Sequence, residues 1–458
     1  MDRPAAPAPA ESGGRIHPAR TDLIALLNLS GPVVISRLGI MAMGLCDTVV
    51  VGRYSAQELG FHALAWAPTS VVLTFAIGLL TGVNVMTARR IGEGCRDLTG
   101  AVLRRGLVYS FWIGLVSMIV LVAGGPSFMH AVGLGPDLAD GASEVLIIFA
   151  LSLPFYGLAV TASMWLEGQS RPGPGAWAMW AANVVNLALL LLLVPGSFGL
   201  PALGAVGGAW ATTGARAFLV IAMLTYIARM PEARALGVFR KPERDRPAEI
   251  EQRHIGYGAG ASNFFEVASF AGMNIVAGWI GGLAVAAFAI TLNVASIVFM
   301  VPLGLATGAA VLVGKAYGAR DLAAVNRAAM VSIGVATAFG LLVSIIIWPT
   351  AALIAKAYTT DLATIAMAAP ALILCCLFFL PDAIQVVVAQ SLRARGDVWV
   401  PSYTHLLSYV VVMAPLAWWL AIPMKFGING IIWAIVIATL ISCGLLVGRF
   451  WMLSRRGI

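Results

Sequence analysis

Long apolar runs separated by short charged breaks recur along the whole chain. A helix needs about 20 apolar residues to cross the hydrocarbon core of a bilayer. Twelve runs reach about that length, at approximately 28–50, 62–87, 106–124, 144–166, 175–195, 204–228, 255–280, 285–312, 329–348, 364–392, 400–420 and 429–453. With 60% hydrophobic and 11% charged residues, the 458-residue chain has too little polar surface for a water-soluble particle. It is predicted to be an all-α polytopic membrane protein with twelve transmembrane helices.

The basic residues predict how these helices are oriented. An even number of spans places both termini on one side of the membrane. The tails and loops on that side then hold all but five of the 29 Lys and Arg; the five are Arg37, Arg53, Arg216, Lys356 and Lys425. Lys and Arg concentrate in cytoplasmic loops, so both termini are expected in the cytoplasm. This topology accounts for the net charge of +8 without a nucleic-acid partner.

Two polar segments divide the chain. Residues 1–22 are rich in Pro and Ala and are predicted to form a disordered cytoplasmic tail. They are not expected to be a signal peptide, because no short apolar core with a cleavage site follows them. Residues 229–254 are predicted to be a cytoplasmic linker between an amino-terminal six-helix lobe (23–228) and a carboxyl-terminal one (255–458). Contact with lipid or a partner is the alternative for the linker.

The two halves share sequence segments in the same order. Gly78–Gly82 recurs as Gly304–Gly308, Arg96–Leu98 as Arg320–Leu322, and Gly204–Gly207 as Gly427–Gly430, each about 225 residues later. Six spans in each half make the repeats parallel. Secondary transporters use this design and hold the substrate between the halves.

Three carboxylates, Asp47, Glu266 and Asp382, lie well inside predicted spans. A charged group there costs about 2.5–3.5 kcal/mol on insertion scales, so it is expected to face the bundle interior or an aqueous cavity. Burial disfavours the ionised form of a carboxyl group, which then exchanges a proton or another cation readily. The three acids therefore predict an antiporter. The alternative for each is a structural hydrogen bond between helices.

For the other polar residues inside the spans, the sequence leaves two roles open. Pro381 frees the carbonyl of Leu377 beside Asp382, either as a cation ligand or as a packing kink. Arg216 either snorkels or pairs with a cavity carboxylate. Arg37 is roughly 15 Å along a helix from Asp47 and is expected to reach the cytoplasmic interface. Further cavity candidates, or helix-to-helix hydrogen-bonding residues, are Asn183, Asn186, Thr212 and Asn293.

The chain gives no motif for an enzyme. Its five histidines are scattered, and its cysteines lack metal-ligand spacing and are expected to act as small apolar residues. We therefore expect no catalytic residue, no cofactor and no metal centre apart from a possible Na⁺ at Glu266 and Asp382.

Four segments resemble the multidrug and toxic compound extrusion (MATE) family, in its bacterial NorM-like branch. They are Met43–Thr48 with the upstream Pro32, Phe264–Val267, Phe299–Pro302, and Asp382–Val387 continuing to Ser391–Arg393. The resemblance implies a V-shaped pair of lobes in the bacterial cytoplasmic (inner) membrane. It implies export of organic cations in exchange for protons or sodium, with Asp47 as the amino-lobe coupling acid. It also implies a cation site at Glu266 and Asp382, and places Asn186 and Thr212 around Asp47.

Two residues depart from the family pattern. Phe378 stands where a tyrosine can precede the aspartate by one turn, and Ala289 stands where glutamine is usual. Both make the carboxyl-lobe cavity less polar and favour protons over sodium as the coupling ion.

Together these features predict a monomeric antiporter that exports organic cations or drug-like xenobiotics. The alternative is a flippase for lipid-linked precursors of the related superfamily. A flippase for a large anionic head group should present several basic residues in its cavity, and the sequence offers at most Arg37 and Arg216. A membrane-embedded enzyme is the third reading.

Overall fold

The computed structural model describes residues 18–131, 135–241 and 245–456, and within these ranges it is helical with no strand. The amino half contains α1 (Pro18–Tyr54), α2 (Ala56–Gly92), α3 (Thr99–Ala131), α4 (Pro136–Leu151), α5 (Leu153–Gly168), α6 (Gly173–Leu193) and α7 (Gly204–Arg229). The carboxyl half contains α8 (Arg246–Ile280), α9 (Gly282–Gly318), α10 (Leu322–Tyr358), α11 (Leu362–Ala394), α12 (Trp399–His405), α13 (Ala414–Ala421) and α14 (Gly427–Arg456). We call the two halves the amino lobe and the carboxyl lobe.

Most of these helices qualify as membrane spans. Ten helical segments of the described chain are long and apolar enough to cross a bilayer, and the pair α4–α5, bent by 40°, counts as one more. The remaining predicted span lies in α8, which has 35 residues but is less apolar because polar residues such as Asn263 and Glu266 interrupt it. The predicted helical bundle is confirmed, with helices longer than the apolar runs that predicted them.

Two expected boundaries were wrong. Helix α1 begins at Pro18, so the last residues of the expected tail are helical, and Asp22 forms an ion pair with Arg327 at 2.6 Å. Residues 1–17 of that tail lie outside the described residues. Helix α8 begins at Arg246, where Asp245 caps it by accepting a hydrogen bond from the Ala248 amide, so the end of the expected linker is also helical.

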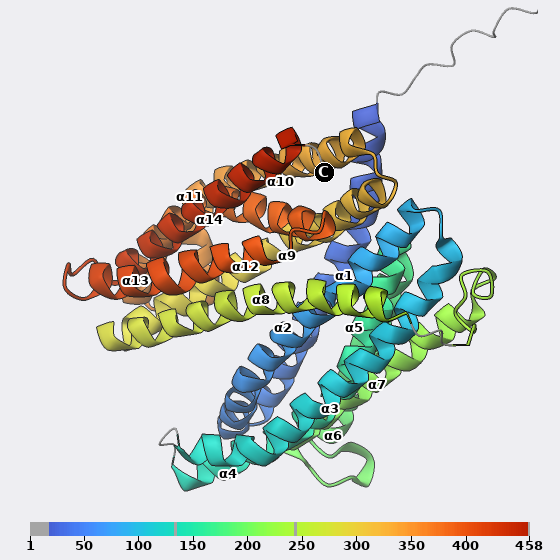
Figure 1. Ribbon diagram of the computed structural model, residues 1–458. Coiled ribbons are helices and arrows are strands. Elements are labelled where there is room, and N and C mark those ends of the chain that lie inside the picture. Colours follow the sequence, from blue (N-terminus) through green and yellow to red (C-terminus); the bar gives the residue numbers. More distant parts are fainter. Residues whose placement is uncertain (1–17, 132–134, 242–244, 457–458) are drawn as a thin grey trace, which may run out of the picture.

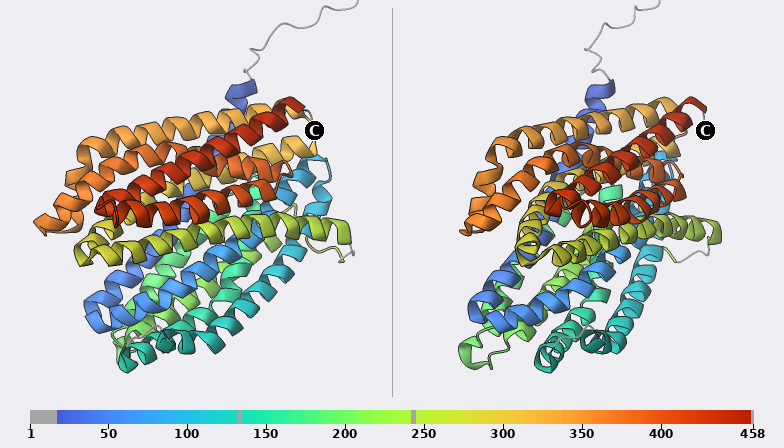
Figure 2. Two further views of the ribbon diagram at one scale, coloured as in Figure 1. Left: turned by 60° about the vertical axis from the view of Figure 1, so that its left-hand side comes forward. Right: turned by 90° about the vertical axis from the view of Figure 1, so that its left-hand side faces the viewer.

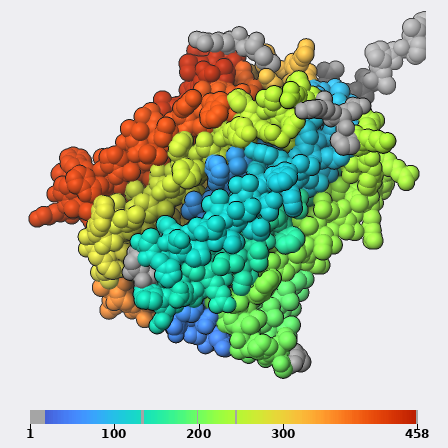
Figure 3. Space-filling view, turned by 60° about the horizontal axis from the view of Figure 1, so that its bottom comes forward, coloured from blue at the N-terminus to red at the C-terminus, as the bar shows by residue number. Residues whose placement is uncertain are grey.

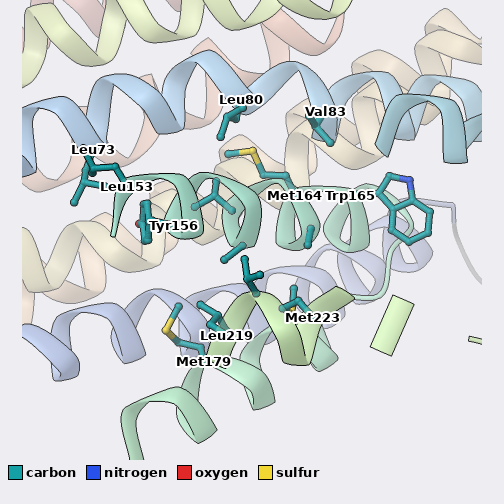
Figure 4. Close-up of a cluster of buried hydrophobic side chains, with 14 of the residues drawn as sticks. Leu73, Leu80, Val83, Leu153, Tyr156, Met164, Trp165, Met179, Leu219 and Met223 are labelled. Atoms are coloured by element: carbon teal, nitrogen blue, oxygen red, sulfur yellow. The ribbon is translucent and has the colours of Figure 1, made fainter. Parts of the chain in front are cut away.

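Each lobe has its own apolar core. In the amino lobe, Trp165 and Phe149 are fully buried among methionine and leucine side chains, part of which Figure 4 shows. In the carboxyl lobe, Phe288, Tyr409 and Met413 are the corresponding large buried residues. Figures 1 and 2 show α8 at the boundary, beside α2 of the amino lobe, which it contacts extensively.

The lobes meet closely at only one end. Helix α1 begins at this end, α14 ends there, and the chain passes there from α7 to α8. In Figure 1 it is the upper right-hand end of the molecule. We call it the basic end. There a β-carbon added to Gly82 would lie 1.9 Å from the carbonyl oxygen of Gln252, and one added to Gly256 would lie 2.0 Å from that of Leu79. Glycine allows α2 and α8 to touch backbone to backbone.

Towards the opposite end, α8 has open space beside its glycines. Gly272 and Gly278 of α8, and Gly44 of α1, have no atom of a described neighbour within 4 Å of an added β-carbon. In the space-filling view, part of α2 (blue) is visible between α8 (yellow-green) and α3 (cyan) (Figure 3). The lobes therefore join at the basic end and separate towards the other.

The contact between the lobes follows the repeat in the sequence. Gly82 of α2 packs on α8, and its repeat partner Gly308 of α9 packs on α1, where an added β-carbon would lie 2.5 Å from Ser30 Oγ. Gly92 faces the carbonyl oxygen of Lys315, and Gly318 faces that of Arg89. Each lobe thus presents the same glycine-rich helix to the other.

Two basic side chains, one from each lobe, make polar contacts with the other lobe. Arg89 at the end of α2 donates to the carbonyl oxygens of Ala394 (3.0 Å) and Arg393 (3.2 Å) at the end of α11. It also pairs with Glu251 at 2.6 Å. Lys315 at the end of α9 donates to Ser170 Oγ after α5, at 2.5 Å. Cations near helix C-termini satisfy terminal carbonyls and the helix dipole, so these contacts stabilise the closed basic end.

Candidate functional site

Asp47 is buried in the amino lobe on the half of α1 away from the basic end. Its side chain is 3% exposed, and Oδ2 accepts a hydrogen bond from Thr212 Oγ1 of α7 at 2.8 Å. Its Oδ1 atom has no hydrogen-bond partner within the described ranges. Asp47 and Thr212 line a small cavity together with Met43, Trp66 and Tyr156. The sequence placed Asp47 and Thr212 in one site, and the structure brings them into direct contact.

Two asparagines of α6 lie on the same side of the lobe. Asn183 donates to the carbonyl oxygens of Gly39 (3.0 Å) and Met179 (2.9 Å), so it joins α6 to α1. Asn186 is fully buried and faces Asp47, beyond the geometric limits of a hydrogen bond. Within the described chain, Asn183 Oδ1 and Asn186 Oδ1 are, like Asp47 Oδ1, buried oxygens without a donor. Asp47 Oδ1 and the nearby Asn186 Oδ1 make the amino-lobe site suited to a proton or a small cation, whereas Asn183 is engaged with α1 at Gly39.

Arg216 lines the same cavity as Asp47 but is held by other groups. It lies one turn after Thr212 on α7 and is 5% exposed. Its guanidinium donates to Ser152 Oγ at 2.5 Å and lies 4.7 Å from the Tyr156 ring centroid. Arg216 therefore does not snorkel, and among the described residues it forms no ion pair with a carboxylate, so neither of the two expectations for it describes its contacts.

Arg37 was expected to reach the cytoplasmic interface, and its guanidinium lies 3.9 Å from Oε1 of Glu167, one residue before the end of α5. Glu167 also accepts a hydrogen bond from Ser163 at 3.1 Å. Glu167 is 4% exposed and is a further buried acid of the amino lobe. It was missed because it lies at the end of an apolar run beside the polar segment Gly168–Arg171.

Asp382 anchors a polar cluster in the carboxyl lobe. It is 5% exposed, and Oδ1 accepts a hydrogen bond from Gln385 Nε2, one turn later on α11, at 2.9 Å. Gln385 also donates to the hydroxyl of Tyr409. Tyr409 lies in a π-helical segment, Leu406–Met413, between α12 and α13. Single π turns inside helices often accompany functional sites.

Glu266 of α8 belongs to the same cluster. It lies close enough to Asp382 and to the buried Arg393 to interact electrostatically with both. Helix α11 runs from Leu362 to Ala394 through Pro381 without a break. The two acids therefore come together as expected, whereas the sequence analysis assigned no role to Arg393.

Two further residues, Asn293 and Ala289, lie differently from what their sequence context suggested, whereas Phe378 lies as expected. Asn293 is exposed and accepts a hydrogen bond from the hydroxyl of Tyr358 at 2.7 Å, apart from the carboxylates. Ala289 is exposed, whereas the adjacent Phe288 is buried. Phe378 is buried one turn before Asp382 and packs against Phe379. Of the two departures from the family pattern, Phe378 is the one that affects the interior.

No group of three or more His, Cys, Asp or Glu side chains suited to a metal ion occurs in the described part of the chain. Asp382 and Glu266 supply two carboxylates, which a monovalent cation would have to supplement with neutral oxygens.

Comparison with known proteins identifies the family. The MatE family model matches the chain twice, at residues 32–192 and 259–419. The chain belongs to the MatE family. It is 60% identical over 439 residues to the probable multidrug resistance protein NorM of Caulobacter vibrioides, covering 96% of this chain and 93% of that protein. It is 32% identical to the protein of the same name from Bradyrhizobium diazoefficiens, covering 95% and 94%.

Solved structures of MatE proteins share the fold. A multidrug resistance MATE family transporter in an outward-facing conformation superposes with a TM-score of 0.86, at 20% identity, covering 94% of this chain and 96% of that one. The twofold match of the MatE model agrees with the repeat read from the sequence. The four segments that carried the resemblance therefore identified the family correctly.

Proposed function

We propose that this MatE protein is a secondary active exporter of organic cations or drug-like compounds, driven by inward flow of protons or sodium. The observation that carries the proposal is the pair Asp382 and Glu266, a buried and a partly buried carboxylate that interact electrostatically in an apolar helical lobe. Buried acids of this kind are retained in membrane spans chiefly for ion or substrate binding. The names of the NorM relatives support multidrug resistance as the biological role.

In this proposal the basic end faces the cytoplasm. The concentration of Lys and Arg at this end supports that orientation. The described conformation is then closed to the cytoplasm and open to the outside, where a coupling cation reaches Asp47 in one lobe and the acid pair in the other. Cation binding favours the return to the inward-open state, and substrate binding favours the opposite step.

We further propose that the coupling ion is the proton and that the protein works as a monomer in the bacterial inner membrane. Phe378, buried one turn before Asp382, offers no oxygen to a sodium ion. A sodium ion needs several oxygen ligands, whereas a proton needs one carboxylate.

The test uses purified protein in proteoliposomes with proton and sodium gradients imposed separately. Ethidium efflux driven by the proton gradient alone is expected. Asp382→Asn and Glu266→Gln should abolish coupled efflux, whereas the control Asp140→Asn, at a side chain that is 73% exposed, should leave it unchanged. Normal efflux by both site variants would refute the proposed mechanism.

A flippase for lipid-linked anionic precursors remains the second candidate. Such a protein needs cavity cations that are free to bind phosphate. In this structure Arg37 pairs with Glu167, and Arg216 is held by Ser152 and Tyr156. The same proteoliposomes therefore should not scramble a fluorescent anionic lipid, and scrambling without ethidium efflux would favour the flippase.

A further inference from the structure

Arg393 is a buried cation with unsatisfied donors. It lies one residue before the end of α11 and is 3% exposed. Its Nε and Nη2 atoms have no hydrogen-bond partner among the residues that the structure describes. A buried guanidinium carries a large desolvation cost unless a nearby charge compensates it. Such a residue therefore needs a counter-ion for at least part of any working cycle.

The groups around Arg393 restrict what that counter-ion can be. The ionisable side chains of this cluster are Glu266 from α8, Asp382 from α11, His405 from α12, Tyr409 from the π segment and Cys443 from α14. Arg393 interacts electrostatically with Glu266 and with His405. The buried His405 ring packs edge-on against Tyr409, 5.4 Å between ring centroids.

Asp382 is already engaged with Gln385, and Glu266 is the carboxylate whose charge acts on Arg393, although Nε and Nη2 of Arg393 do not reach a hydrogen-bond partner among the described residues in this conformation. The cluster thus holds two acids and one permanent cation. If both acids are ionised, Arg393 compensates one of the two charges, and one added cation makes the cluster neutral.

The backbone of Arg393 reaches the other lobe. Its carbonyl oxygen accepts the 3.2 Å hydrogen bond from Arg89 Nη2, and the carbonyl oxygen of Ala394 accepts the 3.0 Å bond from Arg89 Nε. One residue therefore directs its side chain to the acid pair and its carbonyl to the contact that holds the basic end closed. No other residue of the carboxyl-lobe cluster takes part in that contact among the described side chains.

We propose that Arg393 is the internal counter-ion of Glu266 and competes with the coupling cation for this carboxylate. The inference rests on the proposed function, because it assigns the means by which the cation is released. In the cation-free state Arg393 pairs with Glu266. A cation bound at the acid pair displaces the guanidinium and thereby disturbs the end of α11 that Arg89 holds. Return of Arg393 to Glu266 expels the cation, so Arg393 is a positioning residue of the exchange cycle.

The first test measures cation dependence in proteoliposomes, with the gradient that drives the wild-type protein. Arg393→Gln removes the competitor, so half-maximal ethidium exchange should need at least about ten-fold less coupling cation. Maximal exchange should slow, because the bound cation is no longer expelled. Arg393→Lys keeps a positive charge and should stay within about three-fold of the wild type in both respects.

Arg395→Gln is the matched control. This neighbouring arginine turns away from the cluster and donates to the carbonyl oxygen of Leu453 at 2.6 Å. Its removal should leave the half-maximal cation concentration unchanged. A residue with only a structural role would lower maximal exchange without lowering that concentration. An unchanged or raised concentration in Arg393→Gln would overturn the proposal.

A second measurement covers variants that fold poorly. Removing one partner of a buried pair leaves an uncompensated charge, whereas removing both does not. Arg393→Gln and Glu266→Gln should each lower the melting temperature of the purified protein, and the double variant should recover at least half of the larger loss. Additive losses would show that the two residues do not form a pair. Loss of exchange in the wild-type protein itself would instead refute the proposed function.

Discussion

The contact between α2 and α8 at the basic end predicts that Gly82→Ala will open that end. A methyl carbon at this position would lie 1.9 Å from the carbonyl oxygen of Gln252, whereas ordinary contacts are 3.4–4 Å. The two helices must therefore separate by about 1.5 Å. The obstructing atom belongs to backbone and cannot rotate away, which places the cost at the upper end of the usual range for overpacking, about 3 kcal/mol.

Because every 1.4 kcal/mol changes a population ratio ten-fold, this cost shifts the equilibrium towards the open basic end by about 100-fold. Gly272→Ala is the matched control, since the added methyl, on the partner helix α8, meets no atom within 4 Å. The basic-end separation can be followed with spin labels at Arg96→Cys and Arg320→Cys, which are exposed there on opposite lobes.

The measurement is the label-to-label distance distribution in lipid nanodiscs, in a background without the five native cysteines. Gly82→Ala should move most of the population to a longer distance, and Gly272→Ala should leave it in place. An unchanged distribution in Gly82→Ala, or the same shift in both variants, would refute the view that this contact holds the lobes together.

Three other predictions follow from single contacts. Thr212→Val removes the donor to Asp47 and should cost about 1–3 kcal/mol, seen as a lower melting temperature that Thr212→Ser restores. Arg37→Gln and Glu167→Gln should each destabilise the amino lobe by about 3 kcal/mol, and the double change should recover much of the melting temperature; full additivity would contradict a pair. Lys315→Met should lengthen the distance between the spin labels at positions 96 and 320 less than Arg89→Met does. Lys315 makes one polar contact with the other lobe, whereas Arg89 makes three. An equal effect of the two changes would contradict that ranking.

The fold could be predicted largely from the sequence because it depends on long-range patterns. Apolar runs specify the helices, and the recurrence of Gly78–Gly82 as Gly304–Gly308 specifies the paired lobes. The sequence pattern did not predict the structural role of those glycines. Their role in seating each lobe on the first helix of the other depends on how helices cross, which no local sequence shows.

The site was predicted in part. Asp47, Glu266 and Asp382 were singled out because charge inside an apolar run is conspicuous, and the family resemblance implied that Thr212 lies near Asp47 and that Glu266 and Asp382 form one site. Glu167 and Arg393 were overlooked because each lies near the end of a span, where charged residues are usually solvated. Whether such a residue turns inward depends on tertiary packing.

The π-helical segment Leu406–Met413 determines which face of α13 meets the protein core. A π turn contains one residue more than an α turn, and one residue corresponds to about 100° of rotation. Beyond it, α13 buries Ala417 and Ala421 and exposes Trp418 and Trp419. If the segment wound as a regular α-helix, each following residue would advance by one position, so Leu416 and Leu420 would take the buried positions of Ala417 and Ala421. The irregular turn before α13 thus keeps two small alanines at the packed face while Tyr409 stays inside.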